Sequence, residues 1–474
     1  MPPEEMIIAQ SSVDPGDPHQ CSDSVDKNSI INHLLEPLVE RVENGYFRPC
    51  LAVEWGIKPD GLTWMFRLRE GVFFHNGVRL RAKDIVDNLR RIISPSVGVT
   101  FGTEGVYTSY IGDAKFDAIS DEVFTITTDE TMPDLLDLLS EMPMGYGEEL
   151  DKITKNYIGT GPYRLGSKKT TELELEAFNG YWGKNSPVST LTWLSEPKKI
   201  RRAEMVLDRD ADIGSLVGVE GRRLADRSEK AGSREFASWL CVIFMFNTFE
   251  SPFRDRRLRQ ALNYALDMEK IIDEIKDGAA DALNGFLTPH HYGHDPQTEP
   301  YSYDPDRSRS LLSKAGYDNG LKLTMDIPTS MPDEAPRLAD IMKTYYSQVS
   351  VEVDVNSYYN RPEYAERVKE KRIHDLCCFD SSPKSTFRVL REKLISTFKG
   401  PWWQGYHNQE VNRLFFEATR TFNHEKRREI YQTIYTLITE DAPWVFMYRP
   451  HFHWVVGKKA DFWSPDFDGL TKIK

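Results

Sequence analysis

Three histidines lie close together in the middle part of the chain, at His290, His291 and His294 in the segment TPHHYGH. Imidazole nitrogens are common metal ligands, so a group of this kind could hold a metal ion. Pro289 and Gly293 interrupt any helix here, and the segment is predicted to be a loop. The spacing matches no strong metal motif. We therefore predict exposed loop histidines and no metal site, and the alternative is contact with a ligand, including a chelated metal.

A carboxylate at the end of an apolar run is a second candidate for chemistry. In DLCCFDSSPKSTF, residues 375–387, the run that begins at Leu376 ends at Asp380, and Ser-Ser-Pro follows. A short apolar run bounded by a turn is typical of a buried strand. A carboxylate fixed at the end of such a strand can hold a cation through a charge-assisted hydrogen bond. The alternative is that Asp380 is a turn or cap residue.

A third candidate is aromatic. Trp402, Trp403 and Tyr406 lie in GPWWQGYHN, beside glycine and proline residues that indicate a loop. Their spacing is not that of a core face, so we predict a platform on which a ligand stacks. One of the two tryptophans is alternatively buried packing.

The elements around these candidates alternate between strand and helix. Cys241–Phe246 is an unbroken apolar run typical of a buried strand, and Asp255 is predicted to cap an amphipathic helix over 258–266. Further on, the pattern predicts a helix over 304–315 that ends at Gly316, a residue type favoured just after a helix. It also predicts helices over 333–349, 408–420 and 425–439, and strands over 321–327, 351–355 and 444–447. Earlier in the chain it predicts a short strand from residue 6 and a helix over 29–42. Such alternation favours a mixed α/β protein.

Composition excludes several classes of protein. At 474 residues the chain is expected to form two or three domains, and its net charge of −13 without a long basic cluster argues against nucleic acid as a partner. Its five cysteines, Cys21, Cys50, Cys241, Cys377 and Cys378, fit neither a disulfide framework nor a zinc pattern. No apolar run is long enough to span a membrane. The opening residues MPPEEMIIAQ lack the features of a signal peptide, so either one was removed or the protein stays in the cytosol.

Motifs for catalysis are missing from the sequence. It contains no GxSxG, HExxH, P-loop or CxxC pattern, and GTGPY at 159–163 lacks the Lys-Ser/Thr end of a phosphate loop. We interpret GTGPY as a turn before a strand, where glycine supplies unusual backbone angles. The protein is predicted not to be an enzyme and to need no cofactor.

Several motifs together resemble one known family. Asn247-Thr248 is followed by Pro-Phe-x-Asp at 252–255 and by RRLRQALNYALD at 256–267. Residues 51–92 contain Asp-Gly, an aromatic strand, Leu-Arg-x-Gly-Val and Phe-His-x-Gly in order, and GTGPY and the Glu-Asp-Ala-Pro of 440–443 follow. This series is similar to the extracellular solute-binding proteins of family 5, the receptors of peptide, nickel and oligosaccharide ABC importers. The resemblance extends from about residue 6 to about 465.

The resemblance implies an α/β, two-lobed periplasmic-binding-protein-like fold of type II, in its large class, with an extra subdomain in the first lobe and a hinge between the lobes. Lobe one would comprise 1–245 with 446–474 and contain the subdomain 44–155, and lobe two would comprise 250–443. The ligand would be enclosed between them by hinge closure.

The resemblance also implies binding residues. In peptide-binding members, an aspartate at the end of the corresponding strand pairs with the α-ammonium of the ligand, a role that would fall to Asp380. Here the aspartate lies three residues before Pro383 rather than four, and a cysteine replaces the usual upstream tryptophan. The segment from Cys21 to Asn28 lines the cleft in relatives, which suggests Asp23 and Asp26. Tyr107 and Tyr110 occupy a region that reaches the cleft in relatives. The alternative for these four is a structural or solvated side chain.

The function implied is capture of a small peptide or similar polar solute for an ABC importer permease, by a monomer that is periplasmic or extracellular and membrane-associated if a signal peptide was removed, and cytoplasmic otherwise. Two alternatives remain open because fold does not fix function. One is a cytosolic ligand sensor, similar to regulators that carry this domain behind a helix-turn-helix. The other is an enzyme that acts on a small molecule in the same fold.

Overall fold

A computed structural model describes residues 4–95, 97, 106–184, 186, 188–249 and 252–473. The chain forms two compact units. Unit 1 comprises the residues up to Phe236 together with those from Phe452 onward, and unit 2 comprises Ala237–His451. Strands β12 (Ala231–Ala237) and β18 (Trp444–Gly457) contain these two boundaries. The lobe boundaries inferred from the sequence, near 245 and 446, remain a proposal.

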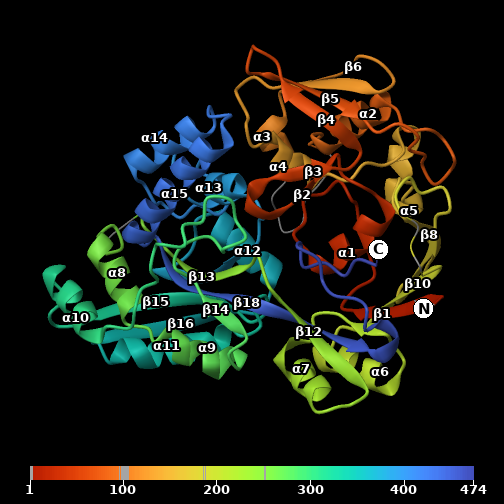
Figure 1. The fold of residues 1–474 in the computed structure, drawn as a ribbon. Helices are drawn as coiled ribbons and strands as arrows, with labels where there is room; N and C mark the ends of the chain where they lie inside the picture. The colour runs from red at the N-terminus through yellow and green to blue at the C-terminus, as the bar shows by residue number, and fades with distance from the viewer. Residues whose placement is uncertain are drawn as a thin grey trace. The chain divides into compact units, whose positions relative to one another are not determined.

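The larger sheet of unit 1 is built around β1 (Glu5–Gln10) (Figure 1). This strand pairs in parallel with β10 and β11, and β9 and β8 continue the sheet in antiparallel pairing beyond β10. The core beneath it includes Trp193, Trp454 and Tyr163, all fully buried. The remaining strands here are β8 (Tyr163–Lys168), β9 (Glu172–Ala177), β10 (Thr190–Ser195) and β11 (Ile213–Gly214), and the helices are α1 (Val25–Leu34), α6 (Lys199–Asp208) and α7 (Gly218–Asp226).

Unit 1 also contains two smaller sheets. One is the hairpin of β2 (Val39–Arg41) and β3 (Phe47–Pro49), and the other has the order β4-β5-β7-β6 with antiparallel pairing throughout. The second sheet buries Phe66 against Phe124, whose rings stack at 5.0 Å. Its elements are β4 (Ala52–Ile57), β5 (Thr63–Leu68), β6 (Lys115–Ala118) and β7 (Val123–Thr127), with α2 (Ala82–Ile92), α3 (Val106–Ile111), α4 (Leu135–Leu139) and α5 (Ile153–Asn156) nearby in sequence.

The sheet of unit 2 has the order β16-β15-β17-β13-β18. Strands β16 and β17 both run parallel to β15, whereas β13 is antiparallel to β17 and to β18. Helix α11 packs against β15 and β16, as Figure 1 shows. The strands are β13 (Cys241–Phe246), β14 (Ala280–Ala282), β15 (Leu321–Pro328), β16 (Val351–Tyr358) and β17 (Leu376–Ser381); the helices are α8 (Arg256–Tyr264), α9 (Met268–Lys276), α10 (Pro305–Lys314), α11 (Ala335–Ser347), α12 (Arg361–Lys369), α13 (Thr386–Lys393), α14 (Gln409–Ala418) and α15 (His424–Asp441).

Several local predictions are confirmed. Every residue of β13 is buried, and the side chain of Asp255 accepts a hydrogen bond from the backbone N–H of Arg257 at the start of α8. Gly316 follows α10 with φ of +90°, the left-handed geometry that favours glycine after a helix. The predicted strands and helices of unit 2 all form, with ends that differ by a few residues except at β18, which is predicted to end at 447 and continues to Gly457.

The helix predicted over 29–42 is wrong in its second half. Helix α1 begins earlier, at Val25 behind the Ser24 cap, and Leu35 is already extended. Pro37 follows, and a proline disfavours helical angles in the residue before it. Residues 39–41 instead form strand β2, which pairs with β3, and Leu38 and Val39 are buried there.

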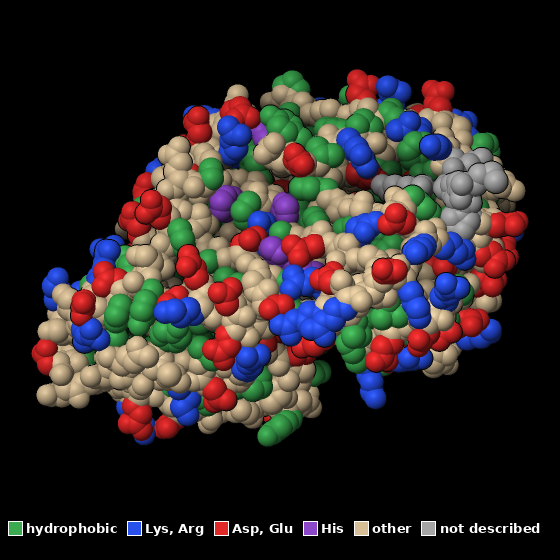
Figure 2. Space-filling view, turned by 60° about the horizontal axis from the view of Figure 1, so that its bottom comes forward, with side chains coloured by type: hydrophobic (Ala, Val, Ile, Leu, Met, Phe, Trp, Pro, Cys, Tyr) green, Lys and Arg blue, Asp and Glu red, His purple; other side chains and the backbone are tan. Residues whose placement is uncertain are grey.

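Among the described residues no helix is long and apolar enough to cross a bilayer. Cys50, Cys241, Cys377 and Cys378 are buried with free thiols. Acidic and basic side chains are interspersed over the face of the molecule in Figure 2, in agreement with a sequence that has no long basic cluster.

Candidate functional site

Asp380 lies at the carboxyl edge of the parallel strands in unit 2. It is the fifth residue of β17, and Arg361 opens α12 after the neighbouring loop. The Arg361 guanidinium Nη2 is 3.2 Å from the Asp380 carboxylate, and Arg361 Nε donates to the carbonyl oxygen of Met331 at 3.1 Å. The edge beyond the carboxyl ends of parallel strands is where α/β proteins commonly place ligands. The candidate carboxylate thus stands in a usual binding position with a cation from its own chain beside it.

Arg361 is held firmly in this place. Its guanidinium lies 4.9 Å from the centre of the Phe379 ring and 5.6 Å from that of Tyr364. The side chain is only 11 % exposed, so its charge is largely removed from water. The sequence prediction missed Arg361, because a lone arginine in the loop-like YYNRPEY carries no spacing signal that points to Asp380.

The expectation that the aromatic group lies outside the core is wrong. Trp402, Trp403 and Tyr406 are 9, 8 and 5 % exposed. Trp402 packs against Phe379 with ring centres 4.9 Å apart, while Trp403 Nε1 donates to the carbonyl oxygen of Tyr406 at 2.7 Å. The Tyr406 hydroxyl donates to Asp441 at 2.8 Å. Contacts with aromatic side chains from other segments of unit 2 therefore bury this loop, and a ligand role for these three residues remains a prediction.

The histidine segment is a loop, as predicted, but the expectation that its histidines are exposed is wrong, since His290 and His294 are half-buried. His291 is buried, and its Nδ1 accepts from the backbone N–H of Thr288 at 3.1 Å. Its Nε2 therefore carries the proton and donates to the carbonyl oxygen of Pro383 at 2.9 Å. His290 Nε2 bonds the carbonyl oxygen of Ala237, and His294 Nε2 bonds Asn284. The three rings are thus engaged as structural hydrogen-bonding groups.

We expect the histidine loop to matter for stability and not for metal binding. Replacing His291 with alanine removes its hydrogen bonds with the Thr288 N–H and the Pro383 carbonyl. This loss should lower the free energy of unfolding by about 1–3 kcal/mol. The triple change His290→Ala, His291→Ala and His294→Ala should leave ligand affinity within a few-fold. Urea unfolding and calorimetric titration with nickel measure the two effects. Tight nickel binding that the triple change abolishes would contradict the structural role.

The candidates in unit 1 lie at two places. Asp23 and Asp26 are at the start of α1: Asp23 is exposed, whereas Asp26 is buried and its carboxylate accepts from the backbone N–H of Ser11 at 3.1 Å. Burial raises the pKa of Asp26 above its usual range, although the bonds from Ser11 oppose the shift. Tyr107 and Tyr110 belong to α3, where Tyr107 is buried and its hydroxyl donates to the carbonyl oxygen of Glu141, and Tyr110 is half-buried. Their contact with a ligand remains a prediction.

A buried carboxylate that the sequence prediction missed is Glu36, after α1. Thr160 and Trp182 each donate to its Oε2 at 2.8 Å, and the Tyr181 hydroxyl donates to its Oε1 at 2.9 Å. Burial raises the pKa of Glu36 to about 7, even though all three donors favour the ionised form. The one sequence signal for this site was Thr160, a polar residue between the two glycines of GTGPY, which donates to Glu36.

Those two glycines have a different role from the one predicted. Neither has a positive φ angle. Instead, a Cβ atom on Gly159 would lie 2.2 Å from the carbonyl oxygen of Leu34, and one on Gly161 would lie 2.3 Å from that of His33. The GTGPY backbone therefore packs directly on the end of α1. This close approach brings the Thr160 hydroxyl to Glu36.

Across the described ranges, no three His, Cys, Asp or Glu side chains are grouped so that they could hold a metal ion. What the structure brings together in unit 2 is an arginine–aspartate pair over an aromatic floor at a strand edge. Such a pair can bind polar groups of a ligand by charge-assisted hydrogen bonds. It offers no nucleophile and base in contact, which acyl or phosphoryl transfer would need.

Comparison with known proteins decides the family. Residues 47–379 match the model of the bacterial extracellular solute-binding proteins, family 5. The chain belongs to this family. The dipeptide-binding protein of Escherichia coli strain K12 is 24 % identical over 444 residues, which cover 87 % of this chain and 82 % of that protein. The glutathione-binding protein GsiB of Pectobacterium atrosepticum is 25 % identical over 460 residues, which cover 94 and 88 %.

The family 5 fold is confirmed by a solved structure. The periplasmic binding protein DppA of Helicobacter pylori, in complex with the peptide STSA, superposes with a TM-score of 0.80 over 98 % of this chain and 96 % of that one, at 20 % identity. The predicted fold class, a mixed α/β two-lobed binding protein, is therefore correct. Family 5 consists of extracellular solute-binding proteins, so the activity of this chain is solute binding.

Proposed function

We propose that this chain is the substrate-binding component of an ABC importer and that it captures a small peptide or a similar polar solute. The observation that supports the proposal is the extent of the family relationship. The dipeptide-binding relative aligns over 87 % of this chain and the glutathione-binding relative over 94 %, so the similarity is not confined to one part of the chain. The partner would be the permease of that importer, and the site of action the periplasm or the outer face of the membrane.

The ligand would contact Asp380 with its cationic group in this proposal. A carboxylate has about four acceptor positions, so Asp380 can accept a hydrogen bond from a ligand in addition to the bond from Arg361 and other contacts within the chain. Arg361 beside it offers a guanidinium, which pairs well with a carboxylate of a zwitterionic solute. The Phe379 ring under Arg361 adds apolar area. A zwitterion such as a di- or tripeptide has both charges that this pair can recognise.

The test of the function is identification of the bound solute. Freshly purified protein would be denatured, and the small molecules released would be compared by mass spectrometry with those from a denatured unrelated protein prepared in parallel. A peptide or amino-acid derivative released in stoichiometric amount supports the proposal. Release of a nucleotide or sugar phosphate, with turnover of that compound by the intact protein, would replace it with a sensor or an enzyme.

Ligand binding is expected to stabilise the chain by mass action. At a ligand concentration about a hundredfold above Kd, the free energy of unfolding should rise by about 2.7 kcal/mol. If the two lobes close on the ligand, small-angle X-ray scattering should also show a smaller radius of gyration with ligand than without. A melting temperature that rises while the scattering curve stays unchanged would contradict closure but not binding.

A further inference from the structure

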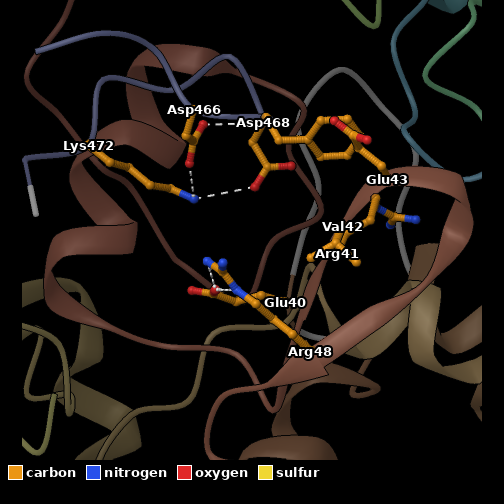
Figure 3. Close-up of a pocket in the computed structure, with 9 residues that line it drawn as sticks. Glu40, Arg41, Val42, Glu43, Arg48, Asp466, Asp468 and Lys472 are labelled. Carbon is orange, nitrogen blue, oxygen red and sulfur yellow. Dashed lines mark hydrogen bonds and ion pairs between the residues drawn. The ribbon is translucent and has the colours of Figure 1, made fainter.

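A polar cavity within unit 1 is lined by none of the residues predicted to contact the transported solute. It has a volume of about 430 Å³, within the range of small-molecule sites. One wall is the β2–β3 hairpin, and the other is the segment 466–472 near the end of the chain (Figure 3). Its lining residues are Glu40, Arg41, Val42, Glu43, Arg48, Asp466, Phe467, Asp468 and Lys472.

The charges in this cavity are arranged around a buried ammonium group. Lys472 Nζ lies 2.9 Å from the carboxylate of Asp466 and 3.3 Å from that of Asp468, and its side chain is only 9 % exposed. Burial opposes the charge of Lys472, but the two aspartates outweigh it and raise the pKa of the lysine. This corner of the cavity is thus already built to hold a desolvated ammonium between carboxylates.

The opposite wall carries another ion pair, in which Arg48 is exposed and Glu40 is half-buried. Arg48 Nε donates to Glu40 at 2.6 Å, and in Figure 3 the arginine and the carboxylate lie across the cavity from Lys472. Glu43, on the turn between β2 and β3, adds an exposed carboxylate. Four carboxylates therefore line the cavity beside three cations.

The third cation contributes little to the cavity. The Arg41 guanidinium forms ion pairs with Asp137 and, at 3.2 Å, with Glu141, and neither carboxylate lines the cavity. The charge of Arg41 is therefore neutralised by carboxylates outside the cavity. Without Arg41, the cavity is lined by four carboxylates and two cations, so its net charge is negative. The carboxylates are those of Glu40, Glu43, Asp466 and Asp468, and the cations are Arg48 and Lys472.

The same walls are unsuited to a metal ion, because within the described part of the chain no group of three acidic, histidine or cysteine side chains has a metal-binding arrangement. They also include apolar surface from Phe467 and Val42. Carboxylates at a spacing that holds an ammonium, together with an aromatic and an aliphatic side chain, suit an organic cation with an alkyl stem.

We propose that this cavity is a second binding site, separate in its residues from the predicted solute site, and that it takes a small organic cation with a primary ammonium or guanidinium group. The cation would bond the carboxylates of Glu43 and Asp468 and place its alkyl part against Phe467. The proposal does not depend on which solute the chain transports.

The test uses the full chain and agmatine, a four-carbon probe with an ammonium at one end and a guanidinium at the other. Agmatine should raise the melting temperature in a saturable way, whereas sodium chloride at equal ionic strength, sodium butyrate and magnesium chloride should not. Glu43→Gln and Asp468→Asn should each weaken agmatine binding about tenfold or more, because each removes a charge-assisted hydrogen bond. Glu220→Gln, an exposed change on α7, is the matched control and should leave the affinity unchanged.

Three outcomes would overturn the proposal. The first is no shift beyond that of sodium chloride. The second is agmatine binding that neither variant weakens, which would place the cation elsewhere. The third is an equal, variant-sensitive effect of magnesium, which would make the cavity a metal site. Because Asp468→Asn removes a partner of buried Lys472 and can impair folding, the exposed Glu43→Gln change decides the matter by itself.

Discussion

Replacing Glu36 with glutamine is expected to make the protein more stable above pH 7 and to remove part of its pH dependence. The carboxyl group has a pKa of about 7 in the folded chain, against an ordinary value of 4.5. A raised pKa means that the folded state binds the proton more tightly than the unfolded state. The contribution of Glu36 to stability is therefore complete below about pH 4.5 and is lost as the pH rises through about 7. The loss amounts to about 3 kcal/mol.

Glutamine is a suitable replacement because it keeps most of the hydrogen bonds. Its amide oxygen can take the place of Oε2 and accept from Thr160 and Trp182, and its NH₂ group can donate to the Tyr181 hydroxyl. The variant should thus resemble the protonated glutamate at every pH. Burial also raises the pKa of Asp84, and the substitution at Glu36 leaves that group unchanged.

The measurement is the difference in unfolding free energy between parent and Glu36→Gln from urea titrations between pH 4.5 and 8. A difference is needed because His19, His75 and His294 act in the opposite direction: burial lowers the pKa of each to about 4, so their contribution rises with pH up to about 6.5. Glu220→Gln is the control and should track the parent. The free energy of unfolding of Glu36→Gln minus that of the parent should rise with pH, and a difference that is flat or that falls would contradict the buried-carboxylate account.

The sequence predicts best where a signal is local and repeated. The buried run Cys241–Phe246, the Asp255 cap and the left-handed Gly316 each depend on a few neighbouring residues, and all are as expected. The family resemblance also depended on local motifs in a fixed order, and the match over 47–379 confirms it.

Prediction fails where distant segments decide the outcome. Nothing near Glu36 in the sequence shows that Thr160, Tyr181 and Trp182 will surround it. The spacing of the aromatic loop predicts side chains outside the core, yet packing against Phe379 and Phe249 from other segments buries its tryptophans. Arg361 reaches Asp380 only because two parallel strands end at the same edge.

Asp380→Asn is expected to weaken binding of a solute that presents an ammonium group by about 2–5 kcal/mol, the typical cost of removing one partner of a desolvated charge pair. The asparagine keeps the shape of the side chain and removes its charge. Asp354→Asn, on an exposed part of β16, is the matched control and should bind like the parent. Affinity would be measured by calorimetric titration with the solute identified by mass spectrometry, after a melt has shown that each variant is folded.

The pairing with Arg361 gives a sharper version of this test, since Asp380→Asn also leaves a largely buried guanidinium without that carboxylate. A double-mutant cycle with Arg361→Met separates the two effects. If Asp380 binds the ammonium, the double variant should be at least as weak as Asp380→Asn, since Arg361→Met also removes the guanidinium proposed to pair with the carboxylate of the ligand. If the loss comes only from the stranded arginine, the double variant should recover affinity. Should Asp380→Asn bind like the parent while Trp402→Ala and Trp403→Ala lose more than about 2 kcal/mol each, stacking holds the ligand, and a sugar-like or aromatic solute replaces the peptide.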